Sequence, residues 1–142
     1  IDIIAQGYSE VIGEVIGLLK KGKIKVSPQD ESKATYSVWR DDKDKEIDWK
    51  QSSEQIFNFI RALGGPYGGA YTFLKGKKIF VFESRIRTDL NFEIRQPGKL
   101  WTISGETATV ICGSGMLEIK KCFREDGSPV EFSRLRVRLG QN

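Results

Sequence analysis

The chain has 142 residues, of which 30% are charged and 39% apolar, and its formal charge is +4. This composition is ordinary for a globular domain of a size that buries a real core. No apolar run approaches the ~20 residues of a membrane helix and no signal-peptide pattern opens the chain, so we expect a cytoplasmic protein.

The charge is unevenly distributed along the chain. Residues 1–66 carry ten Lys/Arg and eleven Asp/Glu, a net charge of −1, whereas residues 67–142 carry thirteen and eight, a net charge of +5. A basic second half suits nucleic acid or phosphorylated ligands, but it is also typical of a mixed solvated surface.

An amphipathic helix is predicted from Tyr8 to Lys21, with Ser9 as its N-cap and Gly22 as its stop. Its apolar stripe consists of Val11, Ile12, Val15, Ile16 and Leu19. This stripe needs a partner, so we expect the helix to dock on the rest of the chain or on another chain. The start at Ile1 without an initiating Met indicates a fragment.

The stretch from Lys23 to Glu46 is polar and rich in alternating charge, which is typical of a linker. Tyr36, Val38 and Trp39 are bulky exceptions that we expect to rest on a domain surface. Trp39 with Arg40 either stacks a base and holds a phosphate, or packs its indole on the domain.

A second helix is predicted from Ser52 to Leu63. Ser52 and Gln55 have the spacing of a capping box, with Asp48 and Gln51 as a second candidate pair. The apolar positions at helical spacing are Ile56, Phe59, Ile60 and Leu63. Gly64-Gly65-Pro66 should end the helix.

After this helix the apolar period changes from helical to two, which indicates short strands. The predicted strands are 70–74, 77–86, 98–104, 107–112 and 116–123, with a turn at 125–129 leading to 130–132. Such strands favour a small barrel, and with the helix beside it the domain is α+β. Residues 88–97 read as an exposed loop, and residues 132–139 as either a strand or a short helix.

Several pieces of the middle of the chain resemble the C-terminal domain of folate-dependent formyltransferases, a family that includes methionyl-tRNA formyltransferase and nucleotide-sugar N-formyltransferases. The matching pieces are Asp48-Trp49, Ile56, Asn58, Ile60-Arg61-Ala62, Pro66-Tyr67 and Gly69-Ala70-Tyr71-Thr72. Upstream, Pro28 to Ser32 and Ala34-Thr35-Tyr36 resemble the family's interdomain linker. The chain departs from the family at Gly68, where relatives usually have proline.

The resemblance implies a division into three parts. Residues 1–24 would be the last helix of an N-terminal Rossmann-like domain, residues 25–46 the linker, and residues 47–142 an OB-like barrel. The family's catalytic Asn, His and Asp and its 10-formyltetrahydrofolate site belong to the N-terminal domain. This chain has no histidine, and the surroundings of Asp2 do not match the family's catalytic motif. We therefore expect no catalytic residue and no cofactor site in this chain.

Candidate substrate-binding residues are Gln29, Tyr36, Trp39, Arg40, Lys77 and Lys78. Residues that carry the family motif, with structural roles expected, are Asp48, Trp49, Arg61, Pro66, Gly69 and Ala70. For Asp48 and Arg61 we favour a mutual ion pair or a helix cap over substrate contact. Cys112 and Cys122 are too far apart along the predicted hairpin for a disulfide, and without histidine they make a poor zinc site.

Alternating arginines at 134, 136 and 138 would form a phosphate-tracking stripe if this segment were a strand, with Lys75, Lys77 and Lys78 nearby. On that reading Phe80, Phe82 or Phe92 would stack RNA bases. We favour core positions for Phe80 and Phe82, and a basic edge also guards against aggregation.

Within the family, Tyr36, Trp39-Arg40, Asp44 and Ile47-Asp48-Trp49 resemble the nucleotide-sugar branch, as does Met116-Leu117-Glu118-Ile119. The partners implied are a catalytic domain or a second copy of the chain, and tRNA or a nucleotide sugar, with no membrane. The alternative is a stand-alone OB-like module that binds nucleic acid or protein.

At the turn before the first strand, Gly68 and Gly69 indicate at least one positive φ. Because Gly69 matches the family's glycine, we expect Gly69→Val to be more costly than Gly68→Pro.

Overall fold

A computed structural model describes the backbone of residues 2–140 and the side chains of residues 4–140. The chain divides into two compact units, residues 1–38 and 39–142, and each is described by itself. The side chain of Asp2 lies outside the described residues.

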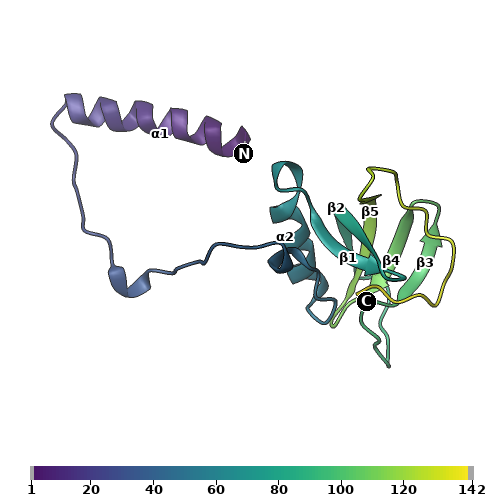
Figure 1. The fold of residues 1–142 in the computed structure, drawn as a ribbon. Coiled ribbons are helices and arrows are strands. Elements are labelled where there is room, and N and C mark those ends of the chain that lie inside the picture. Colours follow the sequence, from purple (N-terminus) through teal and green to yellow (C-terminus); the bar gives the residue numbers. More distant parts are fainter. Residues whose placement is uncertain (1, 141–142) are drawn as a thin grey trace. The chain divides into compact units, whose positions relative to one another are not determined.

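The first unit contains one long helix, α1 (Asp2–Lys20), shown in purple in Figure 1. It begins seven residues before Ser9, so the predicted N-cap is wrong. Ser9 lies inside the helix and its hydroxyl donates to the carbonyl of Ala5. Its predicted end is confirmed, since the N–H groups of Gly22 and Lys23 donate to the carbonyls of Leu19 and Leu18. The five residues of the apolar stripe are 41–60% exposed. The described helices include none long and apolar enough to span a membrane.

An extended segment follows α1 and contains a short 3-10 helix, η1 (Glu31–Lys33). Asp30 caps this turn by accepting a hydrogen bond from the N–H of Ser32. The second unit opens with another 3-10 turn, η2 (Lys43–Lys45), in the dense charge run. Residues 34–42, between these turns, contain no helix or strand.

Helix α2 (Ser53–Leu63) confirms the predicted second helix and its cap. The Ser52 hydroxyl accepts from the N–H of Gln55, and the Gln55 side chain accepts from the N–H of Ser52. Its apolar face buries Ile56, Ile60 and Leu63. A 3-10 turn, η3 (Gly65–Tyr67), then leads the chain into the sheet.

Five antiparallel strands form one sheet in the order β1-β2-β5-β4-β3 (Figure 1). Their bounds are β1 (Ala70–Leu74), β2 (Lys77–Arg87), β3 (Leu100–Ser104), β4 (Thr107–Ile111) and β5 (Met116–Arg124). The predicted strands therefore end within two residues of the observed ones. The small α+β fold is confirmed.

The sheet is open between its edge strands β1 and β3, and the C-terminal segment, residues 132–140, occupies this gap. The N–H of Gly140 donates to the carbonyl of Phe73 in β1, and the N–H of Leu100 in β3 donates to the carbonyl of Val137. Leu139 forms an isolated bridge with Leu74 and is buried. The segment is thus neither a full strand nor a helix, but an extended strap that joins the two edges.

The core lies on one face of the strands, where Ile79, Val81, Leu117 and Ile119 are buried together with the apolar face of α2. The core positions favoured for Phe80 and Phe82 are wrong. Both are only half-buried, because they alternate with Ile79 and Val81 and so point to the opposite face. There Phe82 packs edge-on against Phe123 at 5.7 Å between ring centroids.

The turn into β1 also differs from expectation. Gly68 and Gly69 both have a φ of +83°, so the predicted positive φ is confirmed at both positions. Proline, whose φ is fixed near −65°, does not fit Gly68. The expectation that Gly69→Val is more costly than Gly68→Pro assumed a turn that accepts proline at position 68, and that assumption is wrong because Gly68 has a positive φ.

Candidate functional site

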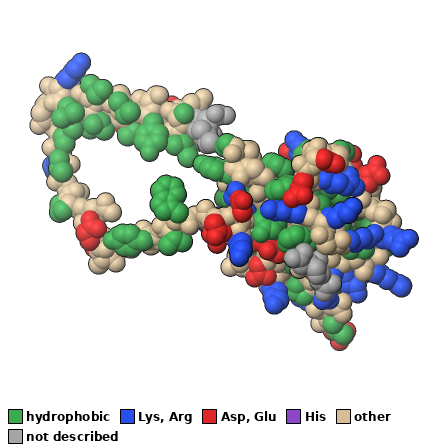
Figure 2. All heavy atoms as spheres, in the orientation of Figure 1, with side chains coloured by type: hydrophobic (Ala, Val, Ile, Leu, Met, Phe, Trp, Pro, Cys, Tyr) green, Lys and Arg blue, Asp and Glu red, His purple; other side chains and the backbone are tan. Residues whose placement is uncertain are grey.

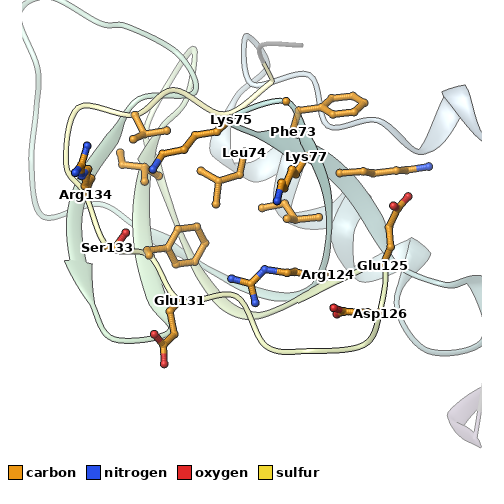
Figure 3. A pocket seen from close by; sticks show the side chains of 16 residues that line it. Phe73, Leu74, Lys75, Lys77, Arg124, Glu125, Asp126, Glu131, Ser133 and Arg134 are labelled. Atoms are coloured by element: carbon orange, nitrogen blue, oxygen red, sulfur yellow. The ribbon is translucent and has the colours of Figure 1, made fainter.

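The second unit contains an open cavity of about 880 Å³ at one end of the sheet (Figure 3). Three elements meet there: the β1–β2 hairpin, the end of β5 with the turn after it, and the strap. Apolar side chains that line it are Phe73, Leu74, Ile79, Leu100, Phe132 and Val137. Charged residues that line it are Lys75, Lys77, Lys78, Arg124 and Arg134, with Glu125, Asp126 and Glu131. The cavity is therefore a basic opening with apolar walls.

The hairpin places its lysines through a two-residue turn. Lys75 and Gly76 have φ values of 53° and 73°, as a type I′ turn requires. The pairing of Leu74 with Lys77 fixes the register, so Lys77 and Lys78 point to opposite faces of the sheet. Both lysines line the cavity, but Lys77 points to the side of Ile79 and Lys78 to the side of Tyr71 and Phe80.

Lys78 is held by aromatic rings on that other face. Its ammonium lies 3.9 Å from the ring centroid of Tyr71 and 5.3 Å from that of Phe80. The Tyr71 hydroxyl donates to the carboxylate of Glu46 at 3.4 Å. Burial, followed by the nearby negative charge of Glu46, raises the pKa of Tyr71. Lys78 thus makes a cation–π contact that competes with any role in binding a ligand.

Arg124 is the most firmly positioned cation of the cavity. It ends β5 opposite Ile79, and its Nη1 donates to the carbonyl of Pro129 at 2.6 Å and to the Ser128 hydroxyl at 3.2 Å. The Ser128 hydroxyl donates in turn to the Asp126 carboxylate at 2.6 Å. This hydrogen bond, with one from the Ser128 N–H, lowers the pKa of Asp126. The turn after β5 therefore fixes both the guanidinium and the carboxylate.

The arginine stripe expected at residues 134, 136 and 138 is interrupted. Arg136 has a φ of 71° and lies in a turn, so the three arginines do not alternate along one strand. Arg138 donates to the side chain of Gln96 at 3.2 Å. Arg134 alone of the three lines the cavity.

The remaining substrate-binding candidates lie elsewhere. Gln29 and Tyr36 belong to the first unit, and Tyr36 is 91% exposed. Trp39 and Arg40 begin the second unit but do not line its cavity, and Trp39 is 100% exposed. The prediction that bulky linker residues rest on a domain surface is wrong for Trp39, which belongs to the second unit and is fully exposed there. For Tyr36 and Val38, which belong to the first unit, it stays a prediction.

The residues of the family motif make structural contacts within the second unit. The Trp49 indole N–H donates to the Thr72 hydroxyl at 2.9 Å in the core. Asp48 accepts from the N–H of Lys50, and Arg61 donates to Asn58, so the two are not paired with each other. Gly69 donates its N–H to the carbonyl of Leu63. Pro66 lies in η3, and Ala70 begins β1 as a buried residue.

Within the described residues, no group of three or more His, Cys, Asp or Glu is arranged to hold a metal ion. Cys112 and Cys122 are free and buried. Burial raises the pKa of each thiol to about 12. Since the thiolate is the nucleophile, neither cysteine is suited to covalent catalysis at neutral pH.

Sequence reasoning identified Lys77 but missed Arg124 and, as a member of this cavity, Arg134. Arg124 approaches the hairpin only because β5 pairs with β2, which is about forty residues away in the chain. The position of Arg134 at the cavity depends on the path of the strap. A turn signal at 125–129 was the one local hint that the end of β5 is held in place.

The comparison with known families decides the classification. Residues 40–136 match the family described as formyl transferase, C-terminal domain. The chain belongs to this family. The match begins at Arg40 and includes both α2 and the whole sheet.

Solved structures of HypX from Aquifex aeolicus have a similar fold. One HypX variant matches 91% of this chain and 23% of its own, at 17% identity and a TM-score of 0.59. HypX in complex with tetrahydrofolic acid matches 87% of this chain and 21% of its own, at 16% identity and a TM-score of 0.55. The chain thus spans about a fifth of the length of these HypX chains. At this identity the likeness concerns the fold alone.

Proposed function

We propose that this chain is the C-terminal part of a cytoplasmic 10-formyltetrahydrofolate-dependent formyltransferase, of the type that formylates nucleotide-linked amino sugars. In this proposal the second unit is an accessory domain that binds substrate or supports the structure. The single observation that carries it is the family match over residues 40–136 in a chain without histidine. The domain is that of a formyltransferase, while the usual general base is missing.

The residues present do not fit the folate group. Transfer of a formyl group to an amine requires a group that takes the amine proton and donors that stabilise the developing oxyanion. The cavity offers five cations, and of its three carboxylates that of Asp126 is bound to its own turn while that of Glu131 points away from the opening (Figure 3). No step of formyl transfer is therefore assigned to this chain, and catalysis is proposed to reside in an N-terminal domain.

Two features support the proposed order of an N-terminal domain that ends in α1, a linker and the C-terminal domain. The similarity to HypX extends over 87–91% of this chain, which is more than the region that matches the family. The exposed apolar stripe on α1 also needs a surface to cover it. Both are consistent with α1 as the last helix of a larger enzyme, followed by a linker.

The choice of a sugar acceptor rests on residues in and near the linker. Tyr36, Trp39-Arg40 and Ile47-Asp48-Trp49 resemble the nucleotide-sugar branch. The interrupted arginine stripe adds physical support, since RNA favours a continuous basic track. Methionyl-tRNA is the competing acceptor.

The test uses the complete protein encoded by the gene, incubated with 10-formyltetrahydrofolate and either a nucleotide-linked amino sugar or methionyl-tRNA. Mass spectrometry of the acceptor should detect formylation of the sugar amine. The control acceptor is the same sugar with its amine acetylated, which should remain unchanged. Formylation of methionyl-tRNA in place of the sugar would overturn the proposed acceptor.

A further inference from the structure

We propose that the cavity at the β1–β2 hairpin binds the diphosphate of a nucleoside diphosphate or of a nucleotide-linked substrate. The biological identity of the ligand rests on the proposed function, but the binding chemistry belongs to this chain. The charge, preorganisation and shape of the cavity support this binding.

The cavity carries cationic charge that its own carboxylates do not neutralise. Among the described residues, no carboxylate lies within ion-pair distance of Lys75, Lys77, Arg124 or Arg134. Figure 3 shows Lys77 and Arg124 reaching over the opening from different elements, whereas the carboxylate of Glu131 points away from it. Figure 2 shows other Lys and Arg side chains gathered on this unit. An anion entering the cavity would meet cations from three elements.

Arg124 is preorganised to hold such an anion. Its Nη1 is used by Ser128 and Pro129, while its Nε and Nη2 make no hydrogen bond within the described part of the chain. A guanidinium that is fixed on one side and unused on the other loses little entropy when it binds a phosphate in two-pronged fashion. Lys77 supplies a second, flexible charge from the facing hairpin.

The shape of the cavity favours a small ligand over a polymer. About 880 Å³ is within the usual range for small-molecule sites, of roughly 300–1,000 Å³. Leu74, Leu100 and Val137 line it and offer apolar contact to a base or sugar. A nucleic acid would need cations continuing outside the cavity, and the turn at Arg136 interrupts that track.

Isothermal titration calorimetry on the 142-residue chain tests the proposal. The probes are UDP, pyrophosphate, inorganic phosphate, uridine and a short single-stranded RNA. UDP should bind measurably and uridine should not. Because charge-assisted hydrogen bonds are strong, Arg124→Gln and Lys77→Ala should each weaken UDP binding about tenfold or more.

Matched variants outside the cavity provide the control. Arg85→Gln changes an exposed arginine on β2, and Lys43→Ala changes an exposed lysine in η2; both should leave UDP affinity within about twofold. Since Arg124 also supports the turn after β5, its variant is compared by thermal unfolding. Lys77→Ala provides an independent test if Arg124→Gln is misfolded.

Four results would overturn the proposal. The first three are absence of UDP binding, equal affinity in the cavity and control variants, and RNA binding that is tighter than UDP and equally weakened by the control variants. Inorganic phosphate binding as tightly as UDP would also overturn it in favour of a simple anion site. Because binding is read directly, its failure is distinguishable from a failure of formyl transfer in the complete protein.

Discussion

At Gly68 and Gly69 two consecutive residues hold a φ of +83°, and they set the angle at which β1 leaves η3. A Cβ on Gly69 would lie 3.1 Å from the Phe82 ring, whereas a Cβ on Gly68 would meet nothing within 4 Å. The two glycines are thus required for different reasons: backbone conformation at Gly68, and conformation with close packing at Gly69.

We predict that Gly68→Pro destabilises the domain more than Gly68→Ala does. Alanine is strained by its positive φ, at a cost of about 1 kcal/mol. Proline cannot adopt this φ and also removes the N–H that donates to Gly65, so we expect roughly 3 kcal/mol. Urea denaturation measures both, with Gly127→Ala as a control at a similar φ, +80°, and in equally open space. Equal stability of the proline variant and the parent would show that the turn is misplaced.

A second prediction concerns Cys112 and Cys122 and the pH dependence of stability. Their pKa is about 12 in the fold because of burial, against an ordinary value of 9.0. Each thiol therefore ionises first in the unfolded chain. Its contribution to stability is complete below pH 9 and is lost as the pH rises towards 12, at about 1.4 kcal/mol per pH unit per thiol.

The free energy of unfolding in urea should thus fall more steeply between pH 9 and 10.5 for the parent than for a Cys112→Ala/Cys122→Ala variant. Tyr71, whose pKa is also raised, leaves a residual slope in both proteins. Identical slopes for parent and variant would mean that the thiols are not buried as described.

At the scale of the elements, the attachment of the strap to the sheet depends on a few residues. Leu139 is buried between β1 and the segment before β3, and its N–H donates to the carbonyl of Gly98 at 2.8 Å. Leu135, four residues earlier, is exposed in the preceding turn. Replacing each leucine by alanine makes the same chemical change at a buried and at an exposed position, so the difference in stability reports burial alone.

We expect Leu139→Ala to destabilise the domain by about 2–5 kcal/mol, as for other buried leucines. Leu135→Ala should change stability by less than about 0.5 kcal/mol. Thermal unfolding followed by circular dichroism compares the two. A Leu139→Ala variant as stable as Leu135→Ala would exclude the strap as a structural closure of the sheet.

The apolar stripe of α1 gives a prediction about association. At ~25 cal/mol per Å² of exposed apolar area, an uncovered stripe favours contact with another surface. We expect sedimentation velocity to show concentration-dependent self-association of the chain, and Ile12→Glu/Ile16→Glu to abolish it. The matched control, Gln6→Glu/Gly13→Glu, adds the same charge to the other side of the helix and should still associate. A parent chain that is monomeric at all concentrations, with the stripe exposed, would refute this.

For the whole molecule, local signals were sufficient to predict most elements. The Ser52 and Gln55 spacing located the start of α2, and Lys75-Gly76 located the hairpin, because capping and tight turns depend on neighbouring residues. The face of β2 that is buried was not predictable by alternation alone, since Ile79 and Val81 alternate with Phe80 and Phe82 and both sets are apolar. The strap could not be predicted because its pairing partners lie 37–67 residues away, from Val137 and Leu100 to Gly140 and Phe73.

The residues of the candidate site were likewise predictable only where they depend on neighbouring residues. Lysine density at the hairpin indicated Lys77, and the structure places it at a cavity. The role of Arg124 depends on non-local pairing with β2 and on the turn at Ser128 and Pro129, which no local pattern specifies. For Trp39 the size of the side chain was misleading, since bulk in a polar segment does not determine what covers it.

We propose that this chain is an accessory part of a formyltransferase and does not catalyse formyl transfer by itself. The most direct measurement is formyl transfer from 10-formyltetrahydrofolate to a nucleotide-linked amino sugar, compared for the 142-residue chain and for the complete protein encoded by the gene. We predict transfer by the complete protein and none above background by the chain alone. Protein-dependent transfer by the isolated chain, or its absence from the complete protein with every acceptor in the family's range, would contradict the account.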